Sequence, residues 1–296
     1  MPYICTVFDY FWCFFRHGMY IDQYEAGEFW RWSNHARKGA VTNIRSSMLR
    51  RRYCKSTHFK YLLNKNLFLQ YFKDYVTREW VFLPEATYQD FEAFCSKHKS
   101  FICKPDDSQQ GKGISIMEVS LDVDLHALYE ELKSGNCLLE ELIVQNSQMC
   151  FGSHSVNTVR LLTVLDKVGK SHIVEAQLRI GRGDSVVDNL SAGGVLYQVD
   201  IDGGYVVDFG YDKQGNKVVF HPGIDRCLVG YRLPNWQIVK NAVLESAKNI
   251  LEIRIIGWDV AITEAGVELV EGNHNPDYFT MKYGTKDLYR LIKSLI

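Results

Sequence analysis

The sequence predicts an α+β protein, and three regions with different residue patterns support that class. The first part of the chain, to about Tyr75, reads as helices, with no proline between Pro2 and Pro84. From Trp80 short strands alternate with helices, and the rest of the chain is β-rich. A chain of 296 residues can bury a sizeable core. We predict three parts: a helical N-terminal segment over residues 1–75, an N-terminal lobe over 76–143 and a C-terminal lobe over 144–296.

The first lobe is expected to begin with a helix capped by Thr87, because Phe91, Phe94 and Cys95 recur behind it at helical spacing. A glycine loop then joins two short strands, and a second helix ends at Gly135. The predicted order is a helix over 87–98, a strand over 100–105, a loop over 108–113, a strand over 114–120, a helix over 125–135 and a buried strand over 137–143.

Runs of apolar and β-branched residues predict strands through most of the second lobe. These runs cover residues 158–166, 171–181, 193–204 and 204–212. A helix over 237–253 follows. The lobe ends in a predicted hairpin, whose two apolar strands flank a turn at 263–266.

The hairpin predicts a metal site. Folding it at the turn brings Asp259 beside Glu271 and Asn273. These side chains offer hard oxygen ligands, which suit Mg²⁺, and protein-bound Mg²⁺ commonly takes further oxygens from nucleotide phosphates. Acidic residues beside an ordinary hairpin are also common, so on this pattern alone the two interpretations stand equal.

Lys104 stands at the end of a predicted strand, just before the glycine loop. Its charge and the backbone NH groups of the loop suit phosphate oxygens, and Gly111 and Gly113 let the loop bend. The loop lacks the Walker A pattern, and an ordinary turn is the alternative. Glu140 and Glu141 end the next strand, where an adenine slot or plain surface charge would fit. Arg160 interrupts an apolar strand, which indicates a carboxylate partner or a phosphate-bearing cleft.

Composition excludes some classes of protein. A net charge of −1 argues against a nucleic-acid binder. The basic stretch from Arg45 to Lys55 is either a solvated helix face or a docking surface. Eight irregularly spaced cysteines predict reduced thiols and a cytoplasmic location. No run reaches the roughly 20 apolar residues of a membrane span, and the N-terminus lacks signal-peptide features. Its aromatic residues still suit a membrane surface or a partner protein such as a glycosyltransferase.

Taken in order, these elements resemble the ATP-grasp superfamily. The order is Lys-Pro with a glycine loop, Glu-Glu-x-Ile, Asn-Thr-x-Arg, Arg followed by Asn-Leu-x-x-Gly-Gly, Asp, and Glu-x-Asn-x-x-Pro, over roughly residues 62–279. Each element alone is weak, but six in one order are specific. With FHPG at 220–223, LPNW at 233–236 and GWD at 257–259, the chain most resembles the sugar-transfer-associated ATP-grasp proteins. The resemblance implies two α/β lobes that clasp a nucleotide.

The resemblance also implies site residues and cofactors. Lys65 and Lys104 would contact phosphates, and Arg160 and Arg179 would meet the γ-phosphate or the developing charge of the intermediate. Asp259, Glu271 and Asn273 would hold two Mg²⁺ ions, for which Mn²⁺ is a substitute. The remaining implied contacts to ATP are Gly111, Gly113, Glu140, Glu141, Leu142, Ile143 and Asn189.

The implied function is an ATP-dependent carboxylate-amine ligase that forms an acylphosphate, acting on a sugar acid or amino acid in cell-surface polysaccharide biosynthesis. The expected partners are therefore a small-molecule acid and an amine. An aromatic and cationic wall of His221, Arg226, Arg232 and Trp236 would suit a sugar acid, or is a loop packed by its own aromatic residues. A kinase that phosphorylates a hydroxyl and a nucleotide-binding scaffold without turnover are the rival interpretations.

Overall fold

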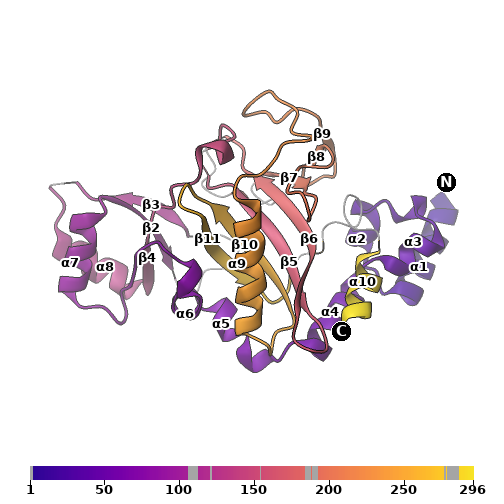
Figure 1. The fold of residues 1–296 in the computed structure, drawn as a ribbon, viewed down its shortest axis with the longest axis horizontal. Coiled ribbons are helices and arrows are strands. Elements are labelled where there is room, and N and C mark those ends of the chain that lie inside the picture. Colours follow the sequence, from indigo (N-terminus) through magenta and orange to yellow (C-terminus); the bar gives the residue numbers. More distant parts are fainter. Residues whose placement is uncertain are drawn as a thin grey trace.

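Two antiparallel sheets form the centre of the molecule, and helices surround them (Figure 1). The computed structural model describes residues 3–105, 113–120, 122–153, 155–183, 188, 193–276, 278 and 287–296. In the view of Figure 1 a four-stranded sheet lies on the left, a seven-stranded sheet lies in the middle and the first helices lie on the right. The α+β class predicted from the sequence is confirmed.

The N-terminal part of the chain is helical. Side chains cap two of these helices: Ser33 accepts a hydrogen bond from the NH of Ala36, and Asn64 accepts one from the NH of Leu67. The helices are α1 (Tyr3–His17), α2 (Ile21–Ala26), α3 (Asn34–Gly39), α4 (Asn43–Tyr53), α5 (Lys60–Leu63) and α6 (Lys65–Tyr71), with short 3-10 helices η1 (Phe29–Arg31), η2 (Ser56–His58) and η3 (Lys73–Tyr75). The last helix of the chain, α10 (Leu288–Leu295), returns to pack against α3 as well as β5 and β6 of the larger sheet.

The smaller sheet has the strand order β1-β4-β2-β3. Its strands are β1 (Trp80–Phe82), β2 (Ser100–Pro105), β3 (Ser115–Glu118) and β4 (Cys137–Glu141), and its helices are α7 (Tyr88–Lys97) and α8 (Leu125–Ser134). Thr87 and Asp90 form a capping box at the start of α7, as the sequence pattern predicts for Thr87. Phe91 and Phe94 of α7 pack with Phe101 of β2 in a separate apolar core.

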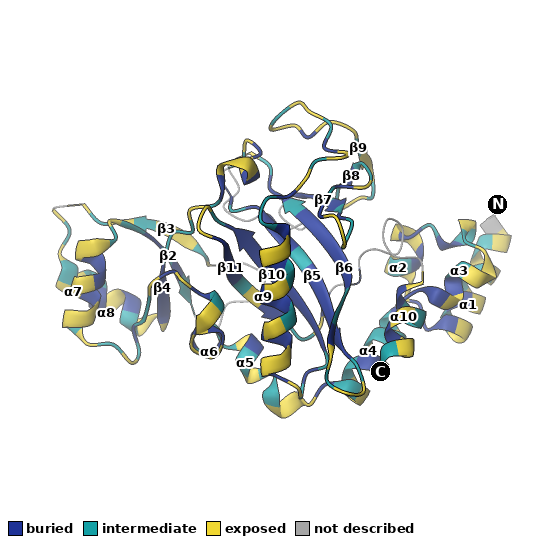
Figure 2. Cartoon of the chain, in the orientation of Figure 1, coloured by how far each residue is buried: buried dark blue, intermediate teal, exposed yellow. Residues whose placement is uncertain are grey.

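The larger sheet has the strand order β11-β10-β5-β6-β7-β8-β9. Its strands are β5 (Thr158–Leu165), β6 (Ser171–Ile180), β7 (Val195–Gln198), β8 (Gly210–Tyr211), β9 (Lys217–Val218), β10 (Ile255–Ile262) and β11 (Val267–Asn273). The long helix α9 (Trp236–Asn249) packs on β5, β6, β10 and β11. Every residue of β10 is buried, and the central strands are dark blue in Figure 2. The core of the molecule therefore lies in this sheet.

Three predicted elements differ from the structure. The strand expected over 193–204 is shorter, because β7 covers only Val195–Gln198. The strand expected over 204–212 is mostly absent, because Tyr205 and Val206 each pair through a single bridge, to Arg232 and Val199. The helix expected to reach residue 253 ends at Asn249. Ile253 instead pairs with Cys54 in an antiparallel bridge, so this apolar stretch joins the first helices to the sheet.

Two further expectations concern membranes and cysteines. In the part of the chain that the structure describes, no helix has both the length and the apolar character needed to cross a bilayer. All eight cysteines are free thiols, and five of them, including Cys95 and Cys103, are buried together with apolar side chains in the cores of the two sheets or of the first helices. Burial raises the pKa of Cys95 to about 11, which keeps this thiol protonated and unreactive at neutral pH.

Candidate active site

A row of charged side chains crosses three strands of the larger sheet. Asp259 on β10 is directly opposite Glu271 on β11 and Arg160 on β5. Residues in direct register point to the same face of a sheet, so the three side chains share one face. A bulge follows Asp259, because Val260 pairs with Leu269 and Val270 is left over. Such irregularities occur next to functional sites, where they redirect a side chain.

Asp259 is buried between two arginines. Arg160 donates to both carboxylate oxygens, with Nη2 at 2.7 Å from Oδ2, and Arg179 Nη1 lies 2.8 Å from the same Oδ2. Burial alone raises the pKa of Asp259, but the charges of Arg160 and Arg179 outweigh it and hold this pKa well below its usual range. Asp259 is therefore an ionised anchor that fixes both guanidinium groups in place.

Glu271 differs from Asp259 although the two lie side by side. Its side chain keeps 56 % of its surface exposed, and its Oε1 lies 3.8 Å from Arg160 Nη2 and accepts a 2.9 Å hydrogen bond from Asn273 Nδ2. The partial burial of its carboxyl group, and then the negative charge of Asp259, raise the pKa of Glu271 to about 6. A carboxylate held next to another carboxylate is a position where a cation would relieve repulsion.

These residues fit Mg²⁺ by the chemistry of their donors, since Asp259, Glu271 and Asn273 all offer oxygen. Both oxygens of Asp259 already accept hydrogen bonds from arginines, so Glu271 and Asn273 are the more available ligands. Within the described ranges no three His, Cys, Asp or Glu side chains converge as a metal site by themselves. A Mg²⁺ ion here would need further oxygens, which water and nucleotide phosphates supply.

A second charged cluster lies around Glu140 of β4. Lys104 Nζ on β2 is 2.6 Å from Glu140 Oε1, and Arg78 Nε is 2.5 Å from Oε2. Burial raises the pKa of Glu140, but the positive charges of Arg78 and Lys104 have the larger effect and lower this pKa to about 2. Glu140 is therefore ionised and orients the ammonium group of Lys104, which lies at the end of β2 as the sequence predicts.

Arg78 joins the two sheets. Besides Glu140 on β4, it contacts Glu268 on β11, with Nη1 at 2.5 Å from Oε1, and donates to the carbonyl of Leu269. Thr77 donates its NH and hydroxyl to the same Glu268. Sequence reasoning missed Arg78 and Glu268; the only signal was a charged residue beside the apolar run of β1. The network places the Lys104 cluster next to the strand that carries Glu271.

The other residues implied for nucleotide binding lie around the end of β2. Lys65, at the start of α6, donates from Nζ to the carbonyl of Pro105 at 2.8 Å. Gly113 has a φ of +74°, and a Cβ there would come within 3.2 Å of Pro105, so this position favours glycine. Glu141 ends β4 and accepts from the NH of Glu79, and Leu142 and Ile143 follow it. Gly111 and Asn189 lie outside the described residues.

Asp188 is a further residue that sequence reasoning missed. Its Oδ2 accepts hydrogen bonds from the NH of Thr158, at 2.8 Å, and from the Thr158 hydroxyl. Burial raises its pKa, the charge of Arg179 lowers it, and the balance remains above the usual value. Thr158 pairs with Arg179 across β5 and β6, so Asp188 flanks the same arginine as Asp259. The available signal was its place directly before Asn189.

The predicted aromatic and cationic wall is largely packed against the protein itself. His221 is 1 % exposed, and Trp236 is buried at the start of α9, with its indole NH donating to Ile201. The guanidinium of Arg226 lies 5.2 Å from the ring of Tyr231, and that of Arg232 lies 5.7 Å from the ring of Tyr205. The structure therefore gives His221 and Trp236 a packing role, and Arg226 and Arg232 lie on neighbouring tyrosines.

Comparison with known proteins adds to this geometry. Residues 44–290 match the family model described as sugar-transfer associated ATP-grasp. An alignment of 88 positions that covers 25 % of this chain shows 43 % identity to the tubulin polyglutamylase ttll6 of Danio rerio. That match spans 11 % of the polyglutamylase, so it says little about the whole of either protein.

Solved structures with a similar fold include the ATP-grasp ligase PsnB complexed with its minimal precursor, with a TM-score of 0.50 and 12 % identity. The alignment covers 82 % of this chain and 64 % of PsnB, less than two thirds of that protein. The D-alanine-D-alanine ligase of Helicobacter pylori gives a TM-score of 0.49 with 17 % identity, over 84 % of this chain and 66 % of the ligase. At 12 % identity the likeness to PsnB bears on the fold alone.

Proposed function

The chain belongs to the sugar-transfer associated ATP-grasp family and has the ATP-grasp fold, and we propose that it is an ATP-dependent ligase that joins a carboxylate to an amine. The observation that carries this proposal is the fixed pair Arg160 and Arg179 around Asp259, with Glu271 alongside. Two oriented guanidinium groups beside a cation-binding carboxylate suit the transfer of a phosphoryl group, where negative charge must be neutralised.

The proposed reaction has two steps. A carboxylate oxygen of the acid attacks the γ-phosphorus of ATP, the bond to the β,γ-bridging oxygen breaks, and ADP leaves with the electron pair. The amine nitrogen then attacks the acyl carbon of the acylphosphate, inorganic phosphate leaves, and the nitrogen loses a proton. No protein nucleophile takes part, so the protein contributes positioning and charge.

The side chains divide this work. Lys104, oriented by Glu140, and Lys65 place positive charge at the end of β2, where Gly113 lies close to Pro105. Arg160 and Arg179 are held before any substrate binds, so they need no reorganisation when charge develops. Mg²⁺ held by Glu271 and Asn273, with Asp259 as a further oxygen ligand, would neutralise more of the phosphate charge.

The adenine is proposed to lie at the end of β4. Glu141, Leu142 and Ile143 are each half-buried where that strand leaves the smaller sheet. Such a strand end offers backbone hydrogen-bond partners beside an apolar surface, which is what an adenine ring requires.

For the substrates, we propose a sugar-linked acid and an amino acid. The family description associates these proteins with sugar transfer, which supports the first. The matched relative is named for polyglutamylation, which supports an amino acid as the amine. Arg226 and Arg232 are the cationic candidates for contacting a sugar acid.

The test is a screen of ADP release with Mg²⁺ over sugar acids and amines, followed by mass detection of the condensed product. Tight ATP binding without ADP release across the panel would favour a scaffold.

Helix α1 is proposed to dock on an anionic membrane surface. Several of its apolar side chains point outward, and Phe8, Phe11 and Phe15 are 71 %, 51 % and 80 % exposed. With Ile4 and Trp12, also exposed, these residues fall on one face of the helix. Another side of the helix is tied to the protein by Asp9, which accepts two hydrogen bonds from Arg37. A helix with its aromatic face outward and a polar side chain inward is unusual unless another surface covers it.

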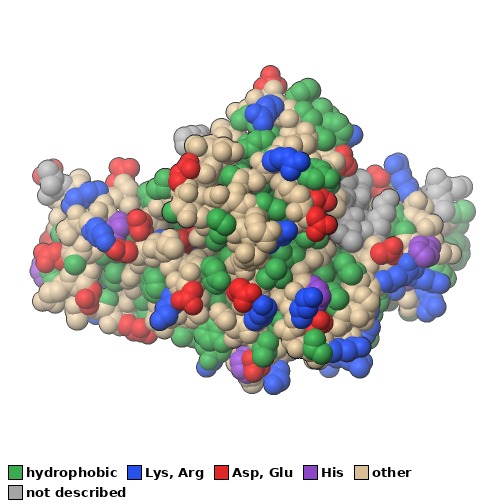
Figure 3. Space-filling model, in the orientation of Figure 1, with side chains coloured by type: hydrophobic (Ala, Val, Ile, Leu, Met, Phe, Trp, Pro, Cys, Tyr) green, Lys and Arg blue, Asp and Glu red, His purple; other side chains and the backbone are tan. Residues whose placement is uncertain are grey.

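Charge favours an anionic lipid surface as that cover. Residues 1–55 contain nine Lys and Arg against four Asp and Glu, whereas the whole chain has a net charge of −1. Lys and Arg are frequent over the N-terminal helices and α10 on the right of Figure 3. Basic residues beside an apolar helix face are typical of helices that lie in the membrane interface.

A further inference from the structure

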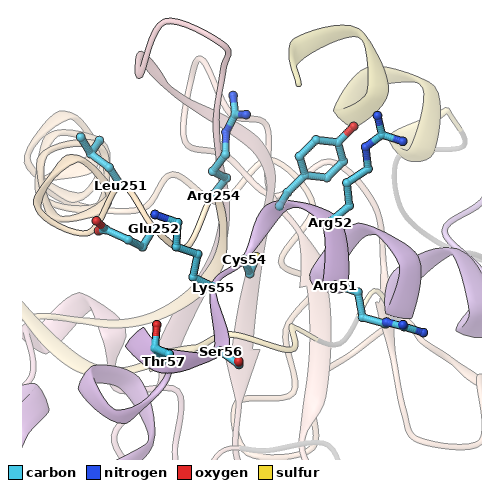
Figure 4. A pocket seen from close by; sticks show the side chains of 10 residues that line it. Arg51, Arg52, Cys54, Lys55, Ser56, Thr57, Leu251, Glu252 and Arg254 are labelled. Carbon is cyan, nitrogen blue, oxygen red and sulfur yellow. The ribbon is translucent and has the colours of Figure 1, made fainter.

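A basic pocket lies away from the candidate active site. It has a volume of about 650 Å³, within the range of small-molecule sites, and is lined by Arg51, Arg52, Tyr53, Cys54, Lys55, Ser56, Thr57, Leu251, Glu252 and Arg254 (Figure 4). Arg254 precedes β10 and Asp259 stands five residues further on, so about 16 Å of extended strand separates the pocket from the arginine pair.

The pocket forms where two distant segments pair. The NH of Lys55 donates to the carbonyl of Glu252 at 2.8 Å, and the NH of Arg254 donates to the carbonyl of Tyr53 at 3.2 Å. Helix α4 ends just before this pairing, with Arg51 and Arg52 in its last turn. In Figure 4 these two arginines lie on one side of the pocket and Glu252 on the other. The pairing therefore brings cations from two parts of the chain around one opening.

The described residues leave most of the positive charge in the pocket without a counter-charge. Four cationic side chains line it against one carboxylate, that of Glu252. Glu252 lies 3.8 Å from His58, and among the described residues no ion pair within 4 Å involves Arg51, Arg52, Lys55 or Arg254. A concave site lined by charges of one sign concentrates ions of the opposite sign.

Arg254 is held in a fixed orientation. Its Nε donates to the carbonyl of Leu165 at 3.1 Å, and its guanidinium carbon lies 5.8 Å from the Tyr53 ring. Its Nη2 is buried and has no hydrogen-bond acceptor within the described part of the chain. Buried donors of this kind normally have a partner, so this nitrogen indicates an acceptor that the described residues do not provide.

We propose that this pocket binds a phosphate ester. The arginines and Lys55 supply charge, and the hydroxyls of Ser56 and Thr57 add hydrogen-bond donors, a set that suits the several oxygens of a phosphoryl group. The volume exceeds what one phosphate needs, and Leu251 and the Tyr53 ring offer apolar surface for an organic part. The same chemistry belongs to a soluble sugar phosphate and to the headgroup of an anionic lipid.

The test is calorimetric titration of the full chain with its nucleotide site filled by Mg²⁺ and a non-hydrolysable ATP analogue. The probes are glucose 1-phosphate, as a sugar phosphate, and glycerol 3-phosphate, as a soluble lipid headgroup. The double variant R51A/R52A removes two exposed charges from the pocket, and R31A/K38A removes two exposed charges from the N-terminal helices as a matched control.

We expect at least one probe to bind, and R51A/R52A to weaken that binding at least about tenfold while R31A/K38A leaves it within about threefold. Affinity for the ATP analogue should be the same in all three proteins, which separates the pocket from the proposed active site. The stronger probe identifies the source of the phosphate ester. Absence of binding by both probes, or equal weakening in the two double variants, would overturn the proposal.

Discussion

Arg160 and Asp259 face each other across β5 and β10, and Arg160 donates a hydrogen bond to each of the two carboxylate oxygens of Asp259. Because Arg179 shares the same carboxylate, one buried negative charge orients two positive ones. Glu271 pairs with Asp259 on the neighbouring strand, and more than half of its side-chain surface is exposed to solvent. The structure thus separates an anchoring carboxylate from an accessible one, and this difference can be tested by mutation.

Replacing Glu271 with Gln is expected to abolish ATP turnover and to change the free energy of unfolding by less than about 1 kcal/mol. The side chain is 56 % exposed, so little packing depends on its charge, whereas Mg²⁺ binding requires the carboxylate. ADP release and denaturant titration measure the two effects. Near-normal turnover would remove Glu271 from the proposed metal site.

Asp259→Asn should behave differently. This substitution leaves Arg160 and Arg179 without their shared counter-charge, and removing one partner of a buried ion pair costs about 3–5 kcal/mol. We expect loss of both turnover and stability, the second visible as a lower denaturation midpoint at unchanged slope. If Asp259→Asn were as stable as Glu271→Gln, the anchoring role of Asp259 would be wrong.

Lys104→Ala is expected to weaken ATP binding by about tenfold to a hundredfold, because it removes a charge that Glu140 holds at the end of β2. The matched control is Lys97→Ala, which removes a lysine paired with Glu79 on the surface of the same lobe. Exposed ion pairs contribute about 0–1 kcal/mol, so Lys97→Ala should bind ATP like wild type. Fluorescence or calorimetric titration compares the two, and equal affinities would argue against a phosphate contact at Lys104.

His221 predicts a pH dependence of stability. Burial, with a smaller effect of the charge of Arg182, lowers the pKa of His221 from 6.5 to about 4. The unfolded chain therefore binds this proton more readily, and the stabilising effect of a neutral His221 is present above pH 6.5 and is lost as the pH falls through about 4. The shift corresponds to about 3 kcal/mol. Denaturant titrations between these pH values should show a steeper loss for wild type than for His221→Gln. Parallel profiles would mean that His221 is open to solvent.

The proposed membrane surface of α1 is tested by vesicle flotation. Phe8→Glu with Phe15→Glu places two charges on the exposed aromatic face and should abolish binding to vesicles containing phosphatidylglycerol. The control, Val144→Glu with Val168→Glu, adds the same charge at two exposed apolar positions outside α1. Wild type and control should float with anionic vesicles and remain unbound to neutral ones. Equal flotation of both double variants would exclude α1 as the docking surface.

The sequence alone was sufficient for the elements whose pattern is local. Thr87 and Asp90 mark the start of α7 because a capping box needs only four residues. The hairpin of Asp259 and Glu271 was also predictable, since its two strands are joined by a short turn. The short pairing around Val206 was not, because it depends on a single bridge to Val199 and on contacts with the later segment at Arg232.

The same limit applies to the site. Arg78 lies 62 residues from Glu140 and 190 residues from Glu268 in the sequence, so the local sequence pattern does not predict their contact. The pairing of Arg160 and Arg179 with one aspartate likewise depends on strand order, which places β5 between β6 and β10. Residue types indicated which chemistry was available, and the sheet determined which of these residues meet.

The most direct test of amide formation through an acylphosphate is trapping by hydroxylamine. The wild-type chain is incubated with ATP, Mg²⁺ and each acid of the sugar-acid and amino-acid panel, with hydroxylamine in place of the natural amine. Release of ADP together with an equal amount of the acid's hydroxamate is the predicted result, and Glu271→Gln should give neither. Release of ADP with a phosphorylated hydroxyl product and no hydroxamate would contradict the ligase assignment and establish a kinase.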